Sequence, residues 1–413
     1  MSSVTNGLPA DIVPFRRDAG TIGLVGAAHL ISHFSQLLLP PLFPWLKDAL
    51  DASYVELGFL MTVFFVVSCV VQTASGFLVD RLGPRPVLFG GLALVSIAAF
   101  GFAISPDYWS MAFFSVVAGI GNGVFHPVDY TLLNRKVSAP RLGHAYSFHG
   151  ITGSLGWAAG PALVVPLAIA FNWRIALAAA GGVALLVLVL MWVYRSHLEL
   201  PPATPAKSRT SGALQETNLA FLRVPAVWMC FTFFLVYAGV LSGVQAFAPE
   251  AARYLHDVPK ALTAACITVY MVCSAGGMVL GGFLASDPNR CEKVVAVGFG
   301  MAAGIALLIG FGSVPALAVP VLFGAMGFAS GIAGPSRDLL VKKSTPENST
   351  GRVYGVVYSG LDIGQALAPL AYGLLMDRQQ YQAVWAGLVL MQVLLIASAF
   401  NVRRVRRTAL VPA

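Results

Sequence analysis

The feature that most constrains this chain is a series of twelve apolar stretches, each about 20 residues long. A helix of that length spans the hydrocarbon core of a bilayer, because each residue adds about 1.5 Å. Only helices or closed barrels can cross lipid, and these stretches are too long for barrel strands. We therefore expect an all-α membrane protein. The twelve expected spans are 21–44, 54–79, 87–104, 108–132, 144–170, 175–194, 226–249, 261–285, 294–312, 314–339, 353–376 and 383–402.

Composition supports a lipid environment. The 413 residues are 57% hydrophobic and 11% charged, whereas soluble chains are about 25% charged. The formal net charge of +8 could suggest nucleic acid as a partner, but that needs a basic face on a soluble domain. Here the basic residues lie in short gaps between apolar stretches, so we expect a lipid bilayer and no nucleic acid.

The spacing of the spans predicts two pseudo-symmetric six-helix bundles, 21–194 and 226–402. A polar, proline-containing linker, 195–225, separates them, and tails at 1–20 and 403–413 flank them. A shift of 208 residues (335 − 127) superposes several positions of the first half on the second. The superposed pairs are Pro127 and Pro335, Gly143 and Gly351, Tyr146 and Tyr354, Gly156 and Gly364, and Pro161 and Pro369. Repeated bundles of this kind are typical of transporters.

The distribution of lysine and arginine predicts the orientation. With the N-terminus inside, 20 of the 26 Lys and Arg residues lie on the cytoplasmic side and five on the outer side, with Arg337 at the inner end of its span. The positive-inside rule then places both termini in the cytoplasm of a bacterial-type inner membrane. The first 19 residues are polar and lack the apolar core of a cleavable signal, so we expect the first span to be retained.

A charged interruption, "SGFLVDRLGPRPVLFGG", joins the second and third spans. It resembles the signature loop of the major facilitator superfamily, approximately G-x-L-x-D-R-x-G-R-[RK]. The matching residues, in order, are Gly76, Leu78, Asp80, Arg81, Gly83 and Arg85, with Pro84 where a basic residue is usual. The resemblance implies a cytoplasmic gate in which Asp80 bridges to the start of the eleventh span, beside Arg81 and Arg85. A plain positive-inside anchor explains the arginines but not Asp80.

Other segments resemble the fosmidomycin-resistance-type branch of this superfamily. They are "HLISHFSQLLLPPLFPWLKDAL", "ELGFLMTVFF" and "GNGVFHP". The fifth span contains "GSLGWAAGPAL", which is similar to the core of a motif associated with antiporters but lacks the two glycines that should follow. The resemblance implies proton-driven export of a small drug or metabolite. Close helix packing would also explain those glycines.

Polar groups within the spans are the candidate functional residues, because they are costly in lipid. Asp362 lies about nine residues, or about 14 Å, from the inner end of its span, which suits a proton-coupling acid. Gln365 shares its face. In the first span, His29, His33 and Gln36 share a face, and His33 is a second proton-coupling candidate. Structural pairing with hydroxyl or backbone groups is the alternative for each.

Further candidates lie at the inner ends of the spans and along the seventh and eighth. Asp129 and Arg337 are equivalent in the repeat (129 + 208), which suggests a charge gate; interfacial solvation is the alternative. His126 and His149 lie near the same end and join the substrate-cavity candidates. Tyr237 and Tyr270 could line the cavity or pack against lipid.

These observations favour a secondary active transporter that works by alternating access and is functional as a monomer. Its expected partners are a small-molecule substrate, protons and the bilayer. Proton-coupled antiport that exports the substrate leads. Uptake of a small organic anion with a proton, and transport of a transition metal or metal chelate by the histidines, are the alternatives. We expect no enzyme activity, cofactor or resident metal: the five cysteines form no CxxC pair and no phosphate-binding GxxxxGK[ST] loop is present.

Overall fold

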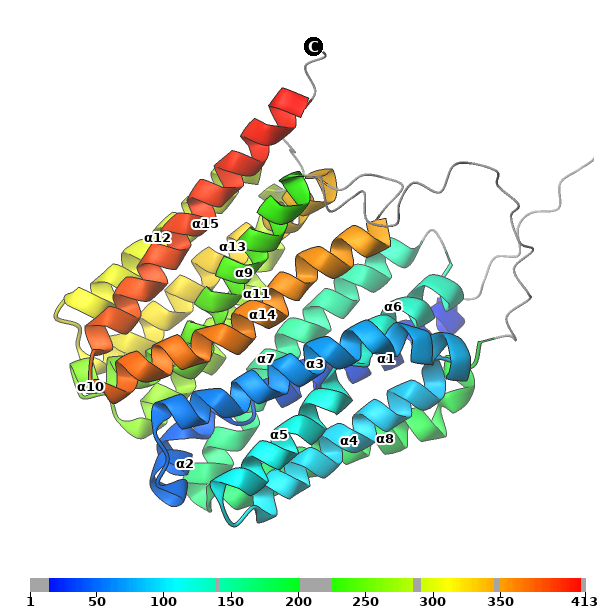
Figure 1. The fold of residues 1–413 in the computed structure, drawn as a ribbon, viewed down its shortest axis with the longest axis horizontal. Coiled ribbons are helices and arrows are strands. Elements are labelled where there is room, and N and C mark those ends of the chain that lie inside the picture. The colour runs from blue at the N-terminus through cyan, green and yellow to red at the C-terminus, as the bar shows by residue number, and fades with distance from the viewer. Residues whose placement is uncertain (1–14, 139–140, 201–224, 285–290, 345–349, 410–413) are drawn as a thin grey trace, which may run out of the picture.

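The computed structural model describes residues 15–138, 141–200, 225–284, 291–344 and 350–409. Every long element is a helix, and the two halves lie side by side (Figure 1). The first half contains α1 (Phe15–Gln36), η1 (Pro40–Leu42), α2 (Phe43–Leu50), α3 (Tyr54–Leu82), α4 (Pro84–Ile104), α5 (Tyr108–Asn122), α6 (Phe125–Lys136), α7 (Leu142–Ala170), α8 (Trp173–Val193) and η3 (Arg195–Leu198). The second contains α9 (Pro225–Ala246), α10 (Ala248–His256), α11 (Lys260–Leu284), α12 (Cys291–Phe311), η5 (Ala316–Ala318), α13 (Val319–Ser344), α14 (Thr350–Asp377) and α15 (Tyr381–Ala409).

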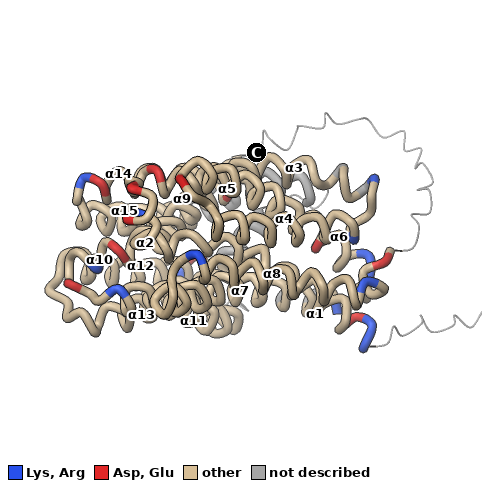
Figure 2. The backbone as a smooth tube through the Cα atoms, turned by 90° about the horizontal axis from the view of Figure 1, so that it is seen from below, with Lys and Arg blue, Asp and Glu red and all other residues tan. Residues whose placement is uncertain are grey.

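The expected fold class, an all-α membrane protein, is confirmed. Within the described residues, 11 helical stretches are long and apolar enough to cross a bilayer. The 28-residue α14 supplies the remaining long helix and packs along α3 and α9. Charged residues gather at the two ends of the bundle and leave the middle of the tube largely uncharged (Figure 2). Of the expected linker, 195–225, residues 201–224 lie outside the described residues, and the first part forms η3.

Three expected spans are broken rather than continuous. The first ends at Gln36, because Pro40 and Pro41 cannot donate to a continuing helix, and the chain turns into η1 and α2. The fourth is divided into α5 and α6, because Pro127 has no N–H to donate to the carbonyl of Gly123. That carbonyl accepts a hydrogen bond from the Ser75 hydroxyl instead, at 3.2 Å. The seventh ends at Ala246, and Pro249 lies in the first turn of α10.

Glycines bring the helices of each half into close contact at related positions. A Cβ atom on Gly156 of α7 would lie 2.3 Å from the carbonyl oxygen of Leu30 on α1. A Cβ on Gly364 of α14 would lie 2.5 Å from the carbonyl oxygen of Leu235 on α9. The fifth long helix of each half therefore packs backbone to backbone on the first, as small residues permit. These are two of the positions that the 208-residue shift superposes.

The two halves meet along a seam between α3 and α14, which run antiparallel. A Cβ on Gly58 would lie 2.7 Å from the Pro369 carbonyl oxygen, and the Thr62 hydroxyl donates to the Ala366 carbonyl. The seam begins at the end of the bundle that carries η1, α2 and α10, away from the C-terminus (Figure 1). We call this the closed end, and the opposite one, where α1 begins and α15 ends, the terminal end.

Candidate functional site

A cluster of four histidines and one aspartate lies inside the first half. His29 and His33 come from α1, His126 and Asp129 from α6, and His149 from α7. We call these five residues the histidine cluster. The ring centroids of His29 and His149 are 3.5 Å apart, those of His29 and His33 4.4 Å, and those of His29 and His126 5.3 Å. The sequence predicted the first pair on one face; the structure adds the other two histidines and Asp129.

Asp129 is the centre of the inner part of this cluster. Its side chain is fully buried, and its Oδ2 lies 3.1 Å from His149 Nε2 and 3.2 Å from His29 Nδ1. Interfacial solvation, one of the two expectations for Asp129, is therefore wrong. The other was a charge gate with Arg337, whose side chain lies outside the described residues.

Several polar atoms of the cluster lack a hydrogen-bond partner among the described residues. They are His33 Nδ1, Asp129 Oδ1 and His29 Nδ1. Although His29 Nδ1 lies 3.2 Å from Asp129 Oδ2, the two atoms do not have hydrogen-bond geometry. Two overlapping groups, His29–His33–His126 and His29–Asp129–His149, each place one donor atom per residue within 4.8 Å of the others. Nitrogen and carboxylate donors at this spacing could exchange protons or bind a transition metal.

A buried asparagine supports the α1 side of the cluster. Asn122, the last residue of α5, accepts from Ser32 at 2.8 Å and from Gln36 at 3.4 Å, and donates to Ser68 of α3 at 2.9 Å. Gln36 also accepts from the indole N–H of Trp157 at 2.9 Å. The Trp157 ring in turn contacts His33, with centroids 4.3 Å apart. Asn122 did not stand out among the sequence candidates, although an asparagine within an apolar span was the available signal.

Asp362 lies on the seam between the halves. It is 12 residues from the start of α14 and 15 from its end, about 18 Å and 22 Å along the helix. Its Oδ2 accepts from Gln72 Nε2 of α3 at 3.4 Å. The contact thus joins the second half to the first near mid-helix. Its partners could not be identified from the sequence.

The remaining cavity candidates pack within the second half. Gln365 and Tyr270 are buried, and the Tyr237 ring contacts Phe299, with centroids 6.2 Å apart. All three lie on helices of the second half, α14, α11 and α9, whereas the histidine cluster lies in the first half. Among the other gate candidates, Arg81 is exposed and Arg85 pairs with Glu199, whereas the side chain of Asp80 lies outside the described residues.

The closed end holds polar contacts that the sequence candidates did not include. Asp377, at the end of α14, accepts from the backbone N–H groups of Tyr54 at 2.8 Å and Val55 at 2.9 Å. The Tyr54 hydroxyl donates to Glu250 at 3.1 Å, and Glu250 pairs with Arg253 of α10. This hydrogen bond from Arg253 to Glu250 raises the pKa of the Arg253 guanidinium.

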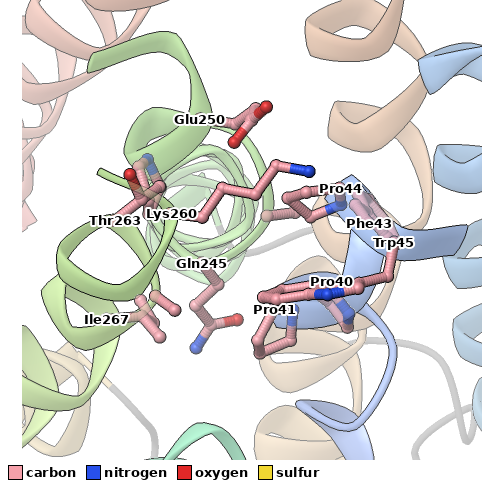
Figure 3. Close-up of a pocket in the computed structure, with 13 residues that line it drawn as sticks. Pro40, Pro41, Phe43, Pro44, Trp45, Gln245, Glu250, Lys260, Thr263 and Ile267 are labelled. Atoms are coloured by element: carbon pink, nitrogen blue, oxygen red, sulfur yellow. The ribbon is translucent and has the colours of Figure 1, made fainter. Parts of the chain in front are cut away.

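A small pocket separates the halves beside these contacts (Figure 3). Pro40, Pro44 and Trp45 line one wall, and Gln245 and Ile267 line the other. The Lys260 side chain extends across it toward the prolines, and its Nζ lies 3.9 Å from Asp48. Deeper in the interface, the Phe43 and Phe247 rings are in contact, with their centroids 5.9 Å apart. The proline-rich break after α1 therefore fits against α9, α10 and α11 and helps to close this end.

Comparisons with known proteins agree with this architecture. A family model described as Major Facilitator Superfamily matches residues 25–369. An uncharacterized MFS-type transporter of Bacillus subtilis, YfnC, is 25% identical over 75% of this chain and 80% of its own length. The fosmidomycin resistance protein of Escherichia coli is 22% identical over 46% of this chain, and the match spans about half (48%) of that relative.

A solved structure has the same fold. The crystal structure of a bacterial homolog to the human lysosomal transporter Spinster, in an inward-facing and unoccupied conformation, superposes with a TM-score of 0.76. The match covers 95% of this chain and 98% of that one, at 14% sequence identity.

Proposed function

The chain belongs to the Major Facilitator Superfamily and is a membrane transporter rather than an enzyme, and we propose that it is a proton-coupled antiporter. In this proposal it exports a small drug or metabolite by alternating access, while protons move inward. The closed end faces the outside of an inner membrane, and both termini lie in the cytoplasm, as the distribution of lysine and arginine indicates. The structure then has the conformation in which the outer gate, at the closed end, is shut.

The observation that carries the proposal is the place of Asp362 on the seam between the two halves. A carboxylate in the apolar middle of a membrane protein is costly and needs a partner, which Gln72 of the other half provides. Protonation of Asp362 removes its negative charge and weakens its hydrogen bond with Gln72. Binding and release of a proton therefore change the relative stability of the conformations that make and break the seam.

Two features favour export over uptake. The chain is similar to a fosmidomycin resistance protein, and α7 carries the segment that resembles the antiporter motif. That segment packs on α1, which carries His29 and His33, and so lies beside the histidine cluster. Uptake of an organic anion is the alternative, and it would call for a cationic side chain near Asp362. Asp362 instead accepts a hydrogen bond from the side-chain amide of Gln72.

Proton movement on addition of substrate tests the proposal. Inverted membrane vesicles with an imposed acidic interior would receive a panel of antibiotics, including fosmidomycin, and small carboxylates. An antiporter lets protons leave the vesicles as substrate enters, and a pH-sensitive dye reports this loss. We expect the loss with wild-type protein but not with Asp362→Asn. Asp51→Asn is the matched control, because Asp51 is exposed in the loop after α2 and should behave as wild type.

Proton entry accompanying substrate entry would instead indicate symport and overturn the antiport assignment. Equal proton loss in Asp362→Asn and wild-type vesicles would show that another group carries the proton.

A further inference from the structure

We infer that the histidine cluster is a binding site for one divalent transition-metal ion, held by His29, His33 and His126. Asp129 orients His29 from the other side of its ring. The inference goes beyond the proposed proton coupling, which Asp362 carries on the seam, so either can fail without the other. The chemistry of the donors, their spacing, their unpartnered atoms and the space beside them all support it.

The donor set selects the class of ion. Three neutral imidazoles are the ligands of borderline divalent ions such as Zn²⁺, Co²⁺ and Ni²⁺, whereas Ca²⁺ and Mg²⁺ prefer oxygen ligands. With three imidazoles bound, a tetrahedral ion keeps one position for water or for a donor atom of a second molecule.

The spacing allows coordination after small side-chain movements. Bonds of about 2.1 Å place the donors of a tetrahedral ion about 3.4 Å apart. In the structure, the three donor atoms lie within 4.8 Å of one another. The largest required approach is therefore about 1.4 Å, which rotation of the imidazole rings can supply. His33 and His126 are partly exposed, so an ion can reach the site, whereas His29 is buried.

One candidate donor atom of the site has no competing hydrogen bond. His33 Nδ1 is buried without a hydrogen-bond partner among the described residues, and an unsatisfied buried polar atom is destabilising. His29 Nδ1 faces Asp129 at 3.2 Å, which leaves Nε2 for an ion. A carboxylate behind a ligating imidazole is the usual arrangement in metal sites, because it fixes the orientation of the ring. His149 shares the same Asp129 oxygen and holds it in place.

A glycine keeps space open beside the donors. A Cβ atom on Gly153 of α7 would lie 2.9 Å from His29 Nε2 and 3.1 Å from His33 Cε1. Gly153→Ala therefore crowds the ligand atoms without removing one. It provides a test that does not depend on deleting a buried histidine.

Titration with Co²⁺ tests the inference, because the visible absorption of bound Co²⁺ reports its ligands and geometry. Full-length protein, purified without a histidine tag and stripped with a chelator, would be titrated in detergent and the Co²⁺ then displaced with Zn²⁺. We expect saturable binding of one ion per chain. His33→Ala and His126→Ala should each weaken it at least about 10-fold. Asp129→Asn should weaken it about 10- to 100-fold, as loss of an orienting partner does. Gly153→Ala should also weaken it.

The matched control is His144→Ala, since His144 is exposed and outside the cluster; its binding should equal that of wild type. Size-exclusion chromatography and thermal unfolding identify variants that fail to fold. The inference is overturned if folded wild-type protein shows no saturable binding. It is also overturned if the His33→Ala/His126→Ala double variant or folded Gly153→Ala binds as wild type does, or if His144→Ala abolishes the signal.

Discussion

Removing the carboxylate of Asp377 should open the closed end of the transporter. The first two backbone N–H groups of α3, those of Tyr54 and Val55, donate across the interface to its two oxygens. Ser53 and Glu56 cap the same helix from within the first half. Asp377 therefore contributes mainly to the contact between the halves, and we expect Asp377→Ala to favour the conformation in which they separate here.

The size of the effect follows from the geometry. Side-chain caps of helix N-termini contribute about 0.5–2 kcal/mol, and attraction of a carboxylate to the helix dipole contributes about 0.3–1 kcal/mol at exposed sites. Because Asp377 is exposed, we take a value of about 1 kcal/mol, near the lower limit. This corresponds to about a fivefold fall in the ratio of closed to open molecules. Asp377→Asn keeps one acceptor oxygen and should have a smaller effect.

Distances between spin labels at the closed end would measure this ratio. Ala49 on α2 and Ala261 on α11 are exposed and belong to different halves, so cysteines there suit a cysteine-depleted background that retains transport. The ratio of the long-distance to the short-distance population should grow about fivefold in Asp377→Ala. Asp107→Ala is the matched control: Asp107 caps α5 by accepting from Ser110 N–H at 2.8 Å, wholly within one half. The reasoning is refuted if Asp377→Ala leaves the distribution unchanged, or if Asp107→Ala changes it equally.

Two further predictions concern packing. Gly156→Ala should destabilise the protein by about 1–3 kcal/mol, because its Cβ would lie 2.3 Å from the Leu30 carbonyl oxygen. Thermal unfolding in detergent measures this change in stability. The control is Gly150→Ala, because a Cβ at Gly150 would have no neighbouring atom within 4 Å. A wild-type melting temperature for Gly156→Ala would contradict the close approach of α7 to α1. Asn122→Leu should cost about 1–3 kcal/mol, because it leaves the buried hydroxyls of Ser32 and Ser68 and the Gln36 amide without their shared partner. A stability equal to wild type would exclude Asn122 as the support of α1. The control is Asn134→Leu on α6, which removes a single exposed hydrogen bond, the one from Tyr146.

The sequence was sufficient to predict the helices because their apolar length is a local property. The breaks after Gln36 and Asn122 were harder to predict. Pro40, Pro41 and Pro127 are evident in the sequence. Whether a proline kinks, ends or divides a span, however, depends on which group donates to the backbone carbonyl that the proline leaves without its N–H donor. For Pro127 the replacement donor is Ser75, 48 positions from the Gly123 carbonyl that it serves.

The candidate site was predictable helix by helix but not between helices. Helical periodicity placed His29 and His33 on one face and Asp362 near the middle of its helix. Their meeting partners come from other helices: Asp129 and His149 approach His29, and Gln72 approaches Asp362. Asp377 was not predictable as a contact between the halves, because an acidic residue at the end of a helix is ordinarily solvated. Its partners are backbone N–H groups, which carry no sequence signature.

The central claim, that Asp362 couples proton movement to transport, is tested most directly by comparing uphill and downhill flux in proteoliposomes. The substrate would be the compound that drives proton loss from the inverted vesicles. With an imposed pH gradient, wild-type protein should accumulate it against its own gradient. Asp362→Asn should fail to do so and still allow downhill exchange, because a permanently neutral side chain resembles the protonated acid. Uphill accumulation by Asp362→Asn at the wild-type level would contradict the account.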